Sequence, residues 1–146
     1  MIIKVWYGEE NKKRLEYKTS GSAGLDLASA IQIVIEAGGI QLIPTGVFVA
    51  IPEGYEGQIR PRSGVALKHG ITVLNSPGTI DSDYREEIGV ILVNHSKGAV
   101  RIDEGDRIAQ LIICKVESCV IEAVESKEEL GTTERTGGFG STGINE

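Results

Sequence analysis

The hydrophobic positions of this chain fall into short runs of β-branched and other aliphatic residues. Gly, Pro, Asn and Asp interrupt most of the runs at nearly regular intervals, a pattern typical of an all-β sandwich, barrel or jelly roll. The expected strands cover residues 2–7, 31–35, 46–51, 56–60, 71–74, 88–94 and 108–116. Only Ser63–His69 looks helical, and no internal repeat or linker divides the chain. The pattern therefore predicts a single β-rich domain.

The expected strand at 88–94 is apolar on both of its faces. These faces carry Ile88, Val90, Leu92 and Gly89, Ile91, Val93. A strand of an antiparallel sheet with one face in solvent would alternate instead. We therefore expect burial on both sides, including burial against another subunit.

The sequence after residue 130 has almost nothing to bury. Such a segment cannot offset the entropy cost of its own ordering, so we expect a β-rich core at 1–130 and a flexible Gly-rich tail at 131–146. Residues 138–143 match G-x-G-x-x-G, but no strand feeds this segment and no helix follows it, as a dinucleotide fingerprint requires. Two interpretations remain, a floppy terminus or a flap that wraps phosphates. Phe139 favours the flap, because an aromatic ring without a core needs something to stack on.

Composition excludes several other classes of protein. The 40% hydrophobic and 25% charged residues are ordinary for a globular domain, whereas 19 glycines are roughly double the usual ~7%. The net charge of −6 shows no basic excess, so we expect no direct binding of nucleic acid. An acidic chain binds a polyphosphate only where cations and backbone N–H groups converge locally.

Targeting signals and a disulfide framework are also missing from the pattern. No apolar run approaches the roughly 20 residues of a membrane helix, and the first residues do not resemble a signal peptide, so we expect no membrane and a cytoplasmic location. Cys114 and Cys119 are too few for a disulfide framework and lack the spacing of a zinc site. Free thiols are the expected state.

The segment Gly78-Thr-Ile-Asp-Ser-Asp-Tyr84 places two carboxylates and a tyrosine between apolar strands. One interpretation is a hairpin turn with solvated carboxylates. Another is a site in which one carboxylate orients a water and Tyr84 forms a flat wall. Asp-x-Asp could also hold a divalent metal through oxygen ligands, and the spacing alone does not choose among these interpretations.

The segment Arg60-Pro-Arg-Ser-Gly64 brings two guanidiniums and a hydroxyl to the start of the expected helix. Ser63 is a good residue for a helix N-cap, so the segment could be an ordinary cap beside exposed arginines. It could also be an anion site, because the free N–H groups and Arg62 favour phosphate.

Two further polar residues stand inside apolar segments. Gln110 lies within an apolar strand, where a buried amide without a hydrogen bond costs ~1–3 kcal/mol. It must therefore meet a neighbouring backbone or face a ligand. Asp26 poses a similar choice between a turn residue and a site carboxylate.

Five segments together resemble the five motifs of the trimeric dUTPase family, in the same order and over about residues 20–143. They are Ser22-Ala-Gly-Leu-Asp-Leu27, Pro61-Arg-Ser-Gly64, Gly78-Thr-Ile-Asp-Ser-Asp-Tyr84, Gly105-Asp-Arg-Ile-Ala-Gln-Leu111 and Gly137-Gly-Phe-Gly-Ser-Thr-Gly143. The resemblance implies a jelly-roll-like β-clip fold and a homotrimer with three active sites, each drawing on all three chains. It implies Mg²⁺-assisted hydrolysis of dUTP to dUMP and pyrophosphate. That reaction limits uracil incorporation into DNA and supplies dUMP for dTMP synthesis.

The resemblance also implies roles for residues around the nucleoside. Asp81 would hold the water that attacks the α-phosphorus. Tyr84 would stack on the deoxyribose and leave no room for a 2′-hydroxyl. Asn75 would hydrogen-bond uracil, together with the hairpin backbone at Gly78 and Thr79.

For the triphosphate, the resemblance implies that Arg62, Ser63, Gly64 and Gln110 hold phosphate oxygens. Asp26 would reach Mg²⁺ through water, with the metal on the triphosphate. In the tail, Phe139 would close over the uracil. The γ-phosphate would be bound by Gly140, Ser141 and Thr142.

The tail departs from the family pattern at one position. The family usually spaces its arginine and aromatic residue as Arg-Gly-x-Gly-Gly-Phe, whereas Arg135-Thr-Gly-Gly-Phe139 is one residue shorter. The resemblance implies a phosphate-binding role for Arg135, which here stands one residue closer to the aromatic ring than in the family pattern.

Two alternative functions remain open at this point. A dCTP deaminase, or a bifunctional enzyme of the same fold, would share the triphosphate site but would need a catalytic glutamate and a different acidic turn. A dUTPase-like regulatory protein would use nucleotide binding to control a partner.

Overall fold

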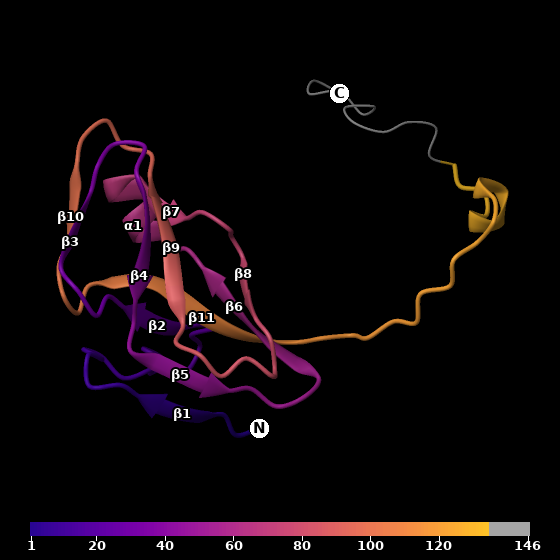
Figure 1. Cartoon of the computed structure of the whole chain (residues 1–146), viewed down its shortest axis with the longest axis horizontal. Helices are drawn as coiled ribbons and strands as arrows, with labels where there is room; N and C mark the ends of the chain where they lie inside the picture. Colours follow the sequence, from indigo (N-terminus) through magenta and orange to yellow (C-terminus); the bar gives the residue numbers. More distant parts are fainter. Residues whose placement is uncertain (135–146) are drawn as a thin grey trace.

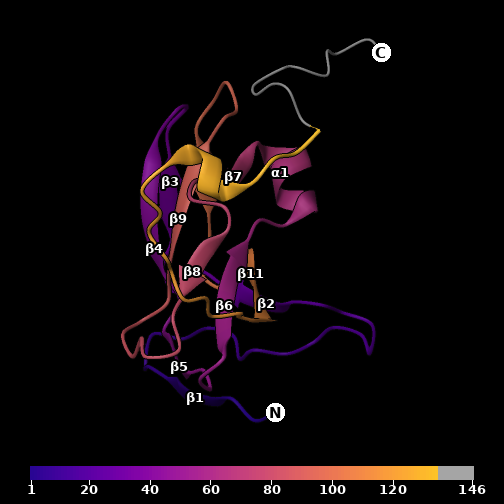
Figure 2. The same ribbon diagram turned by 90° about the vertical axis from the view of Figure 1, so that its right-hand side faces the viewer.

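The structure is a computed structural model that describes residues 1–134. Most of its regular elements are antiparallel strands, arranged as two main sheets and two short ribbons (Figures 1 and 2). No helix in this part of the chain is long and apolar enough to span a membrane. The all-β architecture predicted from the hydrophobic pattern is therefore observed.

The first sheet carries most of the candidate site residues. Its strand order is β2 (Leu25–Ala28), β11 (Arg107–Lys115), β6 (Tyr55–Arg60) and β8 (Gly78–Ile80). Strand β11 pairs with β2 through its first half and with β6 through its second half. The sheet thus brings together segments that lie far apart in the sequence.

The second sheet has the order β4 (Ile40–Pro44), β9 (Gly89–Asn94) and β7 (Ile71–Val73). It faces the first sheet across the core in Figure 2. Between the sheets lie fully buried aliphatic side chains, which include Leu27, Ile59 and Leu111 from the first sheet and Ile43, Val90 and Leu92 from the second. Each such side chain contributes about 1.5–3 kcal/mol of burial free energy, and this core fixes the sheets on which the site is built.

Two antiparallel ribbons complete the strands. Strand β1 (Lys4–Tyr7) pairs with β5 (Val47–Ala50), and β3 (Ile33–Ile35) pairs with β10 (Val100–Ile102). The sequence pattern did not predict β2, β4, β8 or β10 as strands. Each has only three to five residues, and its strand character comes from pairing with a partner strand rather than from a local pattern.

The helix α1 covers Ser63–His69, as predicted, but its cap differs from the prediction. Arg62 is the N-cap and Ser63 is the first helical residue, and Ser63 makes no capping hydrogen bond. Arg62 is extended, with φ −101° and ψ 126°, and its carbonyl accepts from the amides of Val65 and Ala66. The expectation that Ser63 caps the helix was therefore wrong.

The outer face of the second sheet is apolar and partly exposed. Ile40 and Leu42 of β4 are 54% and 65% exposed, and their register partners on β9 are Val93 and Ile91. Within one chain, Val90 and Leu92 are buried in the core and Ile91 remains half-buried. The expected burial of β9 on its second face is thus incomplete in a single chain.

The chain leaves the folded body after β11 as an extended arm, coloured orange to yellow in Figure 1. Residues 117–134 are all exposed. The arm contains a 3-10 helix, η1 (Lys127–Leu130), that the sequence pattern did not predict. Ser126 and Glu129 form its capping box, and the Ser-x-x-Glu spacing is the sequence signal for such a cap. The division at residue 130 remains a prediction, because the predicted tail lies mostly beyond residue 134.

Candidate active site

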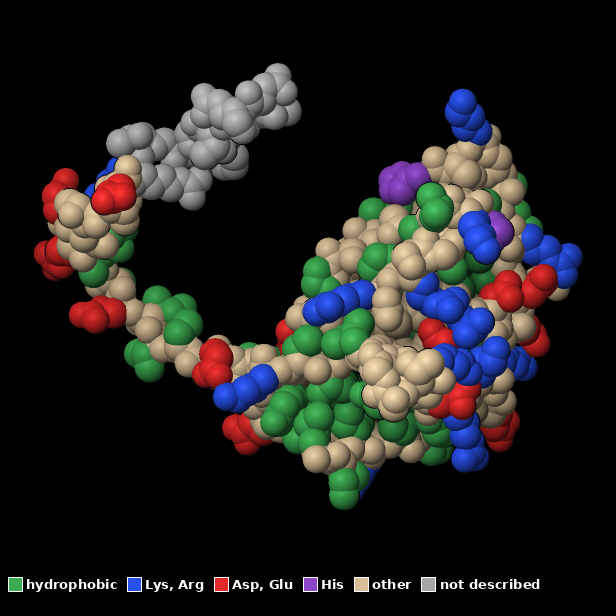
Figure 3. All heavy atoms as spheres, turned by 180° about the vertical axis from the view of Figure 1, so that it is seen from behind, with side chains coloured by type: hydrophobic (Ala, Val, Ile, Leu, Met, Phe, Trp, Pro, Cys, Tyr) green, Lys and Arg blue, Asp and Glu red, His purple; other side chains and the backbone are tan. Residues whose placement is uncertain are grey.

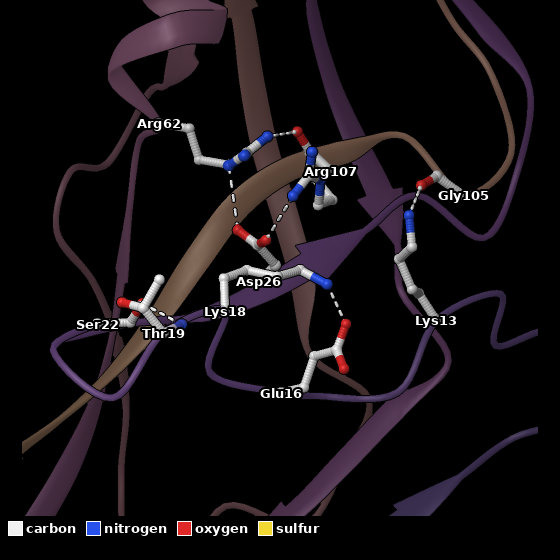
Figure 4. Close-up of polar contacts among 9 residues, drawn as sticks. All are labelled: Lys13, Glu16, Lys18, Thr19, Ser22, Asp26, Arg62, Gly105 and Arg107. Atoms are coloured by element: carbon white, nitrogen blue, oxygen red, sulfur yellow. Dashed lines mark hydrogen bonds and ion pairs between the residues drawn. The ribbon is translucent and has the colours of Figure 1, made fainter.

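Asp26 lies between two arginines at one end of the first sheet (Figure 4). Arg62 Nε is 3.1 Å from Asp26 Oδ1, and Arg107 Nη1 is 3.2 Å from Asp26 Oδ2. The Asp26 side chain is only 15% exposed, so these ion pairs are screened less than surface pairs. Asp26 is therefore a strand residue in a charged cluster and not a turn residue.

Strand register brings this cluster together. Gln110 of β11 lies opposite Asp26 on β2 and opposite Arg60 on β6. Paired residues in a sheet project from the same face, so Asp26 and Gln110 share a face. Arg62 lies two residues after Arg60, the last residue of β6, and its side chain reaches Asp26 from that side.

Gln110 meets a neighbouring backbone and also faces a cavity. Its Nε2 donates to the carbonyl of Pro61 at 2.9 Å, which satisfies one donor of the amide. A methyl group at Gly24 would lie 2.5 Å from the Gln110 Oε1, so the absence of a side chain there leaves room for the amide. The first interpretation, a hydrogen bond to a neighbouring backbone, is therefore confirmed. The second, contact with a ligand, stays a prediction, because the structure shows only that Gln110 borders a cavity.

A cavity of about 420 Å³ opens over the cluster. It is lined by Lys18, Ser22, Ala23, Gly24, Asp26, Arg62, Ser63, Gly64, Arg107 and Gln110. Three of these residues carry positive charge and one carries negative charge, and the hydroxyls and amide add hydrogen-bonding groups. A cavity of this charge favours a polyanion.

Lys18, which lines this cavity, is also paired with an acidic residue outside it, Glu16. It hydrogen-bonds Glu16, and this hydrogen bond together with the ammonium charge lowers the pKa of Glu16 below its ordinary value. The positive charge at the cavity therefore comes mainly from Arg62 and Arg107. In the space-filling view of Figure 3, Lys and Arg side chains gather on the right-hand side of the folded body, with acidic side chains among them.

Gly64 borders the same cavity, and nothing in the fold requires a glycine at this position. A Cβ at this position would meet nothing within 4 Å, and its backbone does not need a positive φ. Glycine inside a helix costs stability relative to alanine. The absent side chain instead keeps the cavity wall open to a ligand.

The second group of predicted residues lies just before β8, on β8 and in the turn that follows it. Asn75 is exposed and lies against Gly78, since a Cβ on Gly78 would be 3.2 Å from Asn75 Nδ2. Thr79 and Asp81 are exposed. The Tyr84 hydroxyl donates to the carbonyl of Glu87 at 2.8 Å and its side chain is 36% exposed, so the ring is held in place with part of its surface free.

Asp81 borders a different cavity, of about 750 Å³, near the start of β6. Its lining includes Glu53, Glu56, Asp83 and one cation, Arg85, and it shares no residue with the cavity over Asp26. The structure of one chain therefore separates the predicted catalytic carboxylate from the predicted phosphate-binding residues.

No cluster of three or more His, Cys, Asp or Glu side chains suited to a metal ion occurs within residues 1–134. Asp26 uses each carboxylate oxygen once toward an arginine, and each oxygen keeps a lone pair that can accept from a water. The donor set fits a water-mediated contact with Mg²⁺ and does not fit direct coordination by several carboxylates.

Five predicted site residues lie outside the part of the chain that the structure describes, and two residues that were not predicted line the cavity over Asp26. Arg135, Phe139, Gly140, Ser141 and Thr142 lie outside the described residues. Arg107 and Lys18 line the cavity although the sequence analysis assigned them no role. Arg107 stands in the quoted segment Gly105-Asp-Arg, so its basic charge within a motif was an available signal; Lys18 gave none.

Comparison with known proteins identifies the family. A sequence model of the dUTPase family matches residues 10–143. The deoxyuridine 5'-triphosphate nucleotidohydrolase of Rickettsia massiliae is 57% identical over 131 residues, which cover 88% of this chain and 87% of that protein. The protein of the same name from Neorickettsia sennetsu is 57% identical over 130 residues, which cover 87% and 85%.

Solved structures agree. The dUTPase of Staphylococcus bacteriophage 80alpha with dUpNHpp superposes with a TM-score of 0.87 at 29% identity, covering 98% of this chain and 99% of that chain. A mutant dUTPase from phage phi11 of S. aureus, whose structure shows the coordination of a structural Mg(II) ion, gives 0.80 at 28% identity, with 88% and 99% covered. The protein is thus an all-β enzyme of the nucleotide hydrolase type. The chain belongs to the dUTPase family, and the family, fold class and class of enzyme predicted from the sequence are confirmed.

Proposed function

We propose that this protein hydrolyses dUTP to dUMP and pyrophosphate with the help of Mg²⁺. The observation that carries the proposal is the cavity over Asp26, which is lined by cationic and hydrogen-bonding side chains in a member of the dUTPase family. The reaction would limit uracil incorporation into DNA and supply dUMP for dTMP synthesis. We place it in the cytoplasm, as the sequence predicts.

The triphosphate would lie in this cavity. Arg62 and Gln110 offer N–H donors, and Ser63 and Gly64 border the cavity at the start of α1. Phosphoryl transfer depends mostly on positioning and on charge stabilisation, and the rigid strands β2, β6 and β11 supply the positions. The predicted tail residues would add contacts on the γ-phosphate, with Arg135, Gly140, Ser141 and Thr142 assigned to this role.

Asp26 would contact Mg²⁺ through water, with the metal carried by the triphosphate. When bound, Mg²⁺ neutralises phosphate charge and polarises the phosphoryl oxygens. The two arginines hold the carboxylate of Asp26 in one orientation, so its free lone pairs can accept from a metal-bound water. The Mg(II) ion of the phage phi11 enzyme is described as structural, and we assign a substrate-linked role here.

Asp81 would orient the attacking water and accept its proton. The water oxygen forms a bond to the α-phosphorus, the bond from that phosphorus to the bridging oxygen breaks, and pyrophosphate leaves with the bridging oxygen. Asp81 is exposed in one chain, and a positioned carboxylate can act as a general base.

The nucleoside would be recognised along β8 and its turn. Tyr84 would form the wall against the deoxyribose, and Asn75, with the backbone of Gly78 and Thr79, would bind the uracil edge. Phe139 would cover the base from the tail. Support comes from the fixed Tyr84 ring and from the close approach of Asn75 to Gly78.

We further propose a homotrimer whose active sites are shared between subunits. Support comes from the separation of Asp81 from Arg62 within one chain and from the apolar outer face of β4 and β9, where Ile40 and Leu42 are more than half exposed. Contiguous exposed apolar surface of this kind marks an interface.

A nucleotide panel tests the reaction. Purified protein is incubated with dUTP, UTP, dCTP or dTTP and Mg²⁺, and both pyrophosphate and ammonia are measured. We expect pyrophosphate from dUTP only, because a site that hydrogen-bonds the base discriminates strongly. Ammonia from dCTP would instead indicate a deaminase of the same fold. Nucleotide binding without any product would indicate a regulatory protein.

A further inference from the structure

We infer that Arg107 is a positioning residue for the triphosphate site, acting through Asp26 and Arg62. The inference rests on the proposed function and adds a residue that the family resemblance did not assign. Arg107 belongs to β11, and its side chain and its backbone carbonyl both take part in the cluster of Figure 4.

A β-bulge brings the Arg107 side chain to the site. Opposite β2, Arg107 pairs with Ala28 and Ala109 pairs with Leu27, so Ile108 is an extra residue on β11. Ala109 and Leu111 are 0% and 1% exposed and face the core. Strict alternation would send Arg107 to that same face. The extra residue shifts the alternation, as bulges do next to functional sites.

Because of the bulge, two consecutive residues of β11, Ile108 and Ala109, are both buried. Ile108 is 2% exposed and points into the core, as its neighbour Ala109 does. Arg107 is thereby placed on the opposite face, which it shares with Gln110 and Asp26. A hydrophobic strand therefore presents an arginine to the cavity without burying its charge.

Arg107 closes a ring of three interactions. Its Nη1 bonds Asp26 at 3.2 Å, its backbone carbonyl accepts from Arg62 Nη1 at 2.8 Å, and Arg62 Nε bonds Asp26 at 3.1 Å. The Arg62 guanidinium is thus held at two of its nitrogens, Nε and Nη1. Its Nη2 takes part in none of these three interactions, so the donors of Nη2 can serve a phosphate oxygen.

Charge gives Arg107 a second effect. Asp26 neutralises one of the two arginines, so the ring keeps one net positive charge. Without Arg107, Arg62 and Asp26 would form a neutral pair, and each would lose the contact with Arg107 that fixes its position. Arg107 thereby leaves Arg62 free to bind phosphate and holds Asp26 in the orientation needed for a metal-bound water.

Calorimetric titration with dUpNHpp and Mg²⁺ tests this role. The variants are Arg107→Met, Asp26→Asn and the double variant, with Arg101→Met as a charge-matched control, because Arg101 is exposed on β10 and pairs with Asp103. We expect Arg107→Met to weaken binding of dUpNHpp about 10–100-fold, the usual value of a charge-assisted hydrogen bond. The control should change binding less than about threefold.

Two readouts separate positioning from a merely structural role. In the Asp26→Asn background, Arg107→Met should cost clearly less than it does in the wild-type background, because residues that act as a unit are not additive. Binding of dUMP, which lacks the β- and γ-phosphates, should change far less than binding of dUpNHpp. Arg107→Lys should restore part of the affinity, since lysine keeps the charge but not the fork geometry.

Three outcomes would overturn the inference: wild-type affinity in Arg107→Met, additive losses with Asp26→Asn, or equal losses for dUMP and dUpNHpp. If Arg107→Met does not fold, the same comparisons are made with Arg107→Lys, for which severalfold weakening coupled to Asp26 is expected and additivity refutes the inference. Failure of the wild-type protein to bind dUpNHpp would refute the proposed function itself, before any variant is compared.

Discussion

Asp81 and Arg62 lie beyond opposite ends of strand β6 in the same chain. Asp81 follows Ile80, whose register partner is Gly57 near the start of β6, whereas Arg62 follows Arg60 at its end. Six residues of extended strand separate the two positions, on the order of 20 Å. Figure 2 shows β8 running antiparallel to β6, away from α1. If both residues act on one dUTP molecule, they must come from different chains.

Asp81→Asn should abolish hydrolysis and leave nucleotide binding largely intact. The amide keeps the shape of the side chain but cannot accept the proton of the attacking water. We expect kcat to fall by ~10²–10⁴-fold, the usual contribution of a positioned base, with little change in the Kd of dUpNHpp. Steady-state kinetics and titration measure the two quantities.

Asp83→Asn is the matched control, because Asp83 borders the same cavity two residues away. It should keep kcat within a fewfold of wild type. If Asp81→Asn keeps near-normal kcat and Asp83→Asn loses it, Asp83 is the base and the assignment of Asp81 is wrong.

Gly64→Ala should raise stability while lowering activity. A Cβ at Gly64 meets nothing within 4 Å, so alanine should stabilise α1 by about 0.5–1 kcal/mol. The added methyl projects at the wall of the phosphate cavity, where a displacement of about 1 Å can lower kcat/KM by roughly 10–100-fold. Thermal unfolding and kinetics should therefore move in opposite directions.

Gly98→Ala controls for the change of residue type, since a Cβ at Gly98 also meets nothing within 4 Å and Gly98 is remote from the lining of the cavity. Its kcat/KM should equal that of wild type. Full activity in Gly64→Ala would show that the open wall at this position is not used by the substrate.

Leu42→Glu should dissociate the trimer. Leu42 is 65% exposed on the outer face of the second sheet, and a carboxylate there would have to be buried between subunits at high cost. If the proposed trimer is correct, light scattering should show the mass falling from roughly three chains to one chain of 15.6 kDa. Activity should be lost with it, because the proposed site is shared between subunits.

Val34→Glu provides the comparison at an apolar side chain of similar exposure, 47%, on the β3–β10 ribbon. It should remain trimeric and active. A Leu42→Glu variant that stays trimeric would show that the face of β4 and β9 is not the interface.

The fold could be predicted where a segment carries its own signal. The run at 46–51 and the helix at Ser63–His69 were predicted because apolar residues and flanking turn residues mark them. Strand β10 was missed because it has only three residues and the middle one is Arg101. The strand character of β10 comes from its pairing with β3. Tertiary pairing of this kind leaves no local pattern in the sequence.

The site was predicted less completely for a related reason. Asp26 and Gln110 were identified as polar residues in apolar segments, and the structure places them opposite each other. Arg107 was not assigned a role. The bulge at Ile108, which turns its side chain from the core to the site, has no signal in the sequence. The separation of Asp81 from Arg62 depends on the pairing of β8 with β6, which no single motif encodes.

The account depends most on the sharing of Asp81 and Arg62 between subunits, and mixed trimers test this directly. Inactive Asp81→Asn and inactive Arg62→Ala chains are unfolded, mixed in equal amounts and refolded together, with mass spectrometry confirming mixed trimers. A working site needs Asp81 from an Arg62→Ala chain and Arg62 from an adjacent Asp81→Asn chain. Random mixing in a cyclic trimer creates this pairing at about one site in four, so roughly a quarter of wild-type activity should return. Mixed trimers without activity would contradict the shared site.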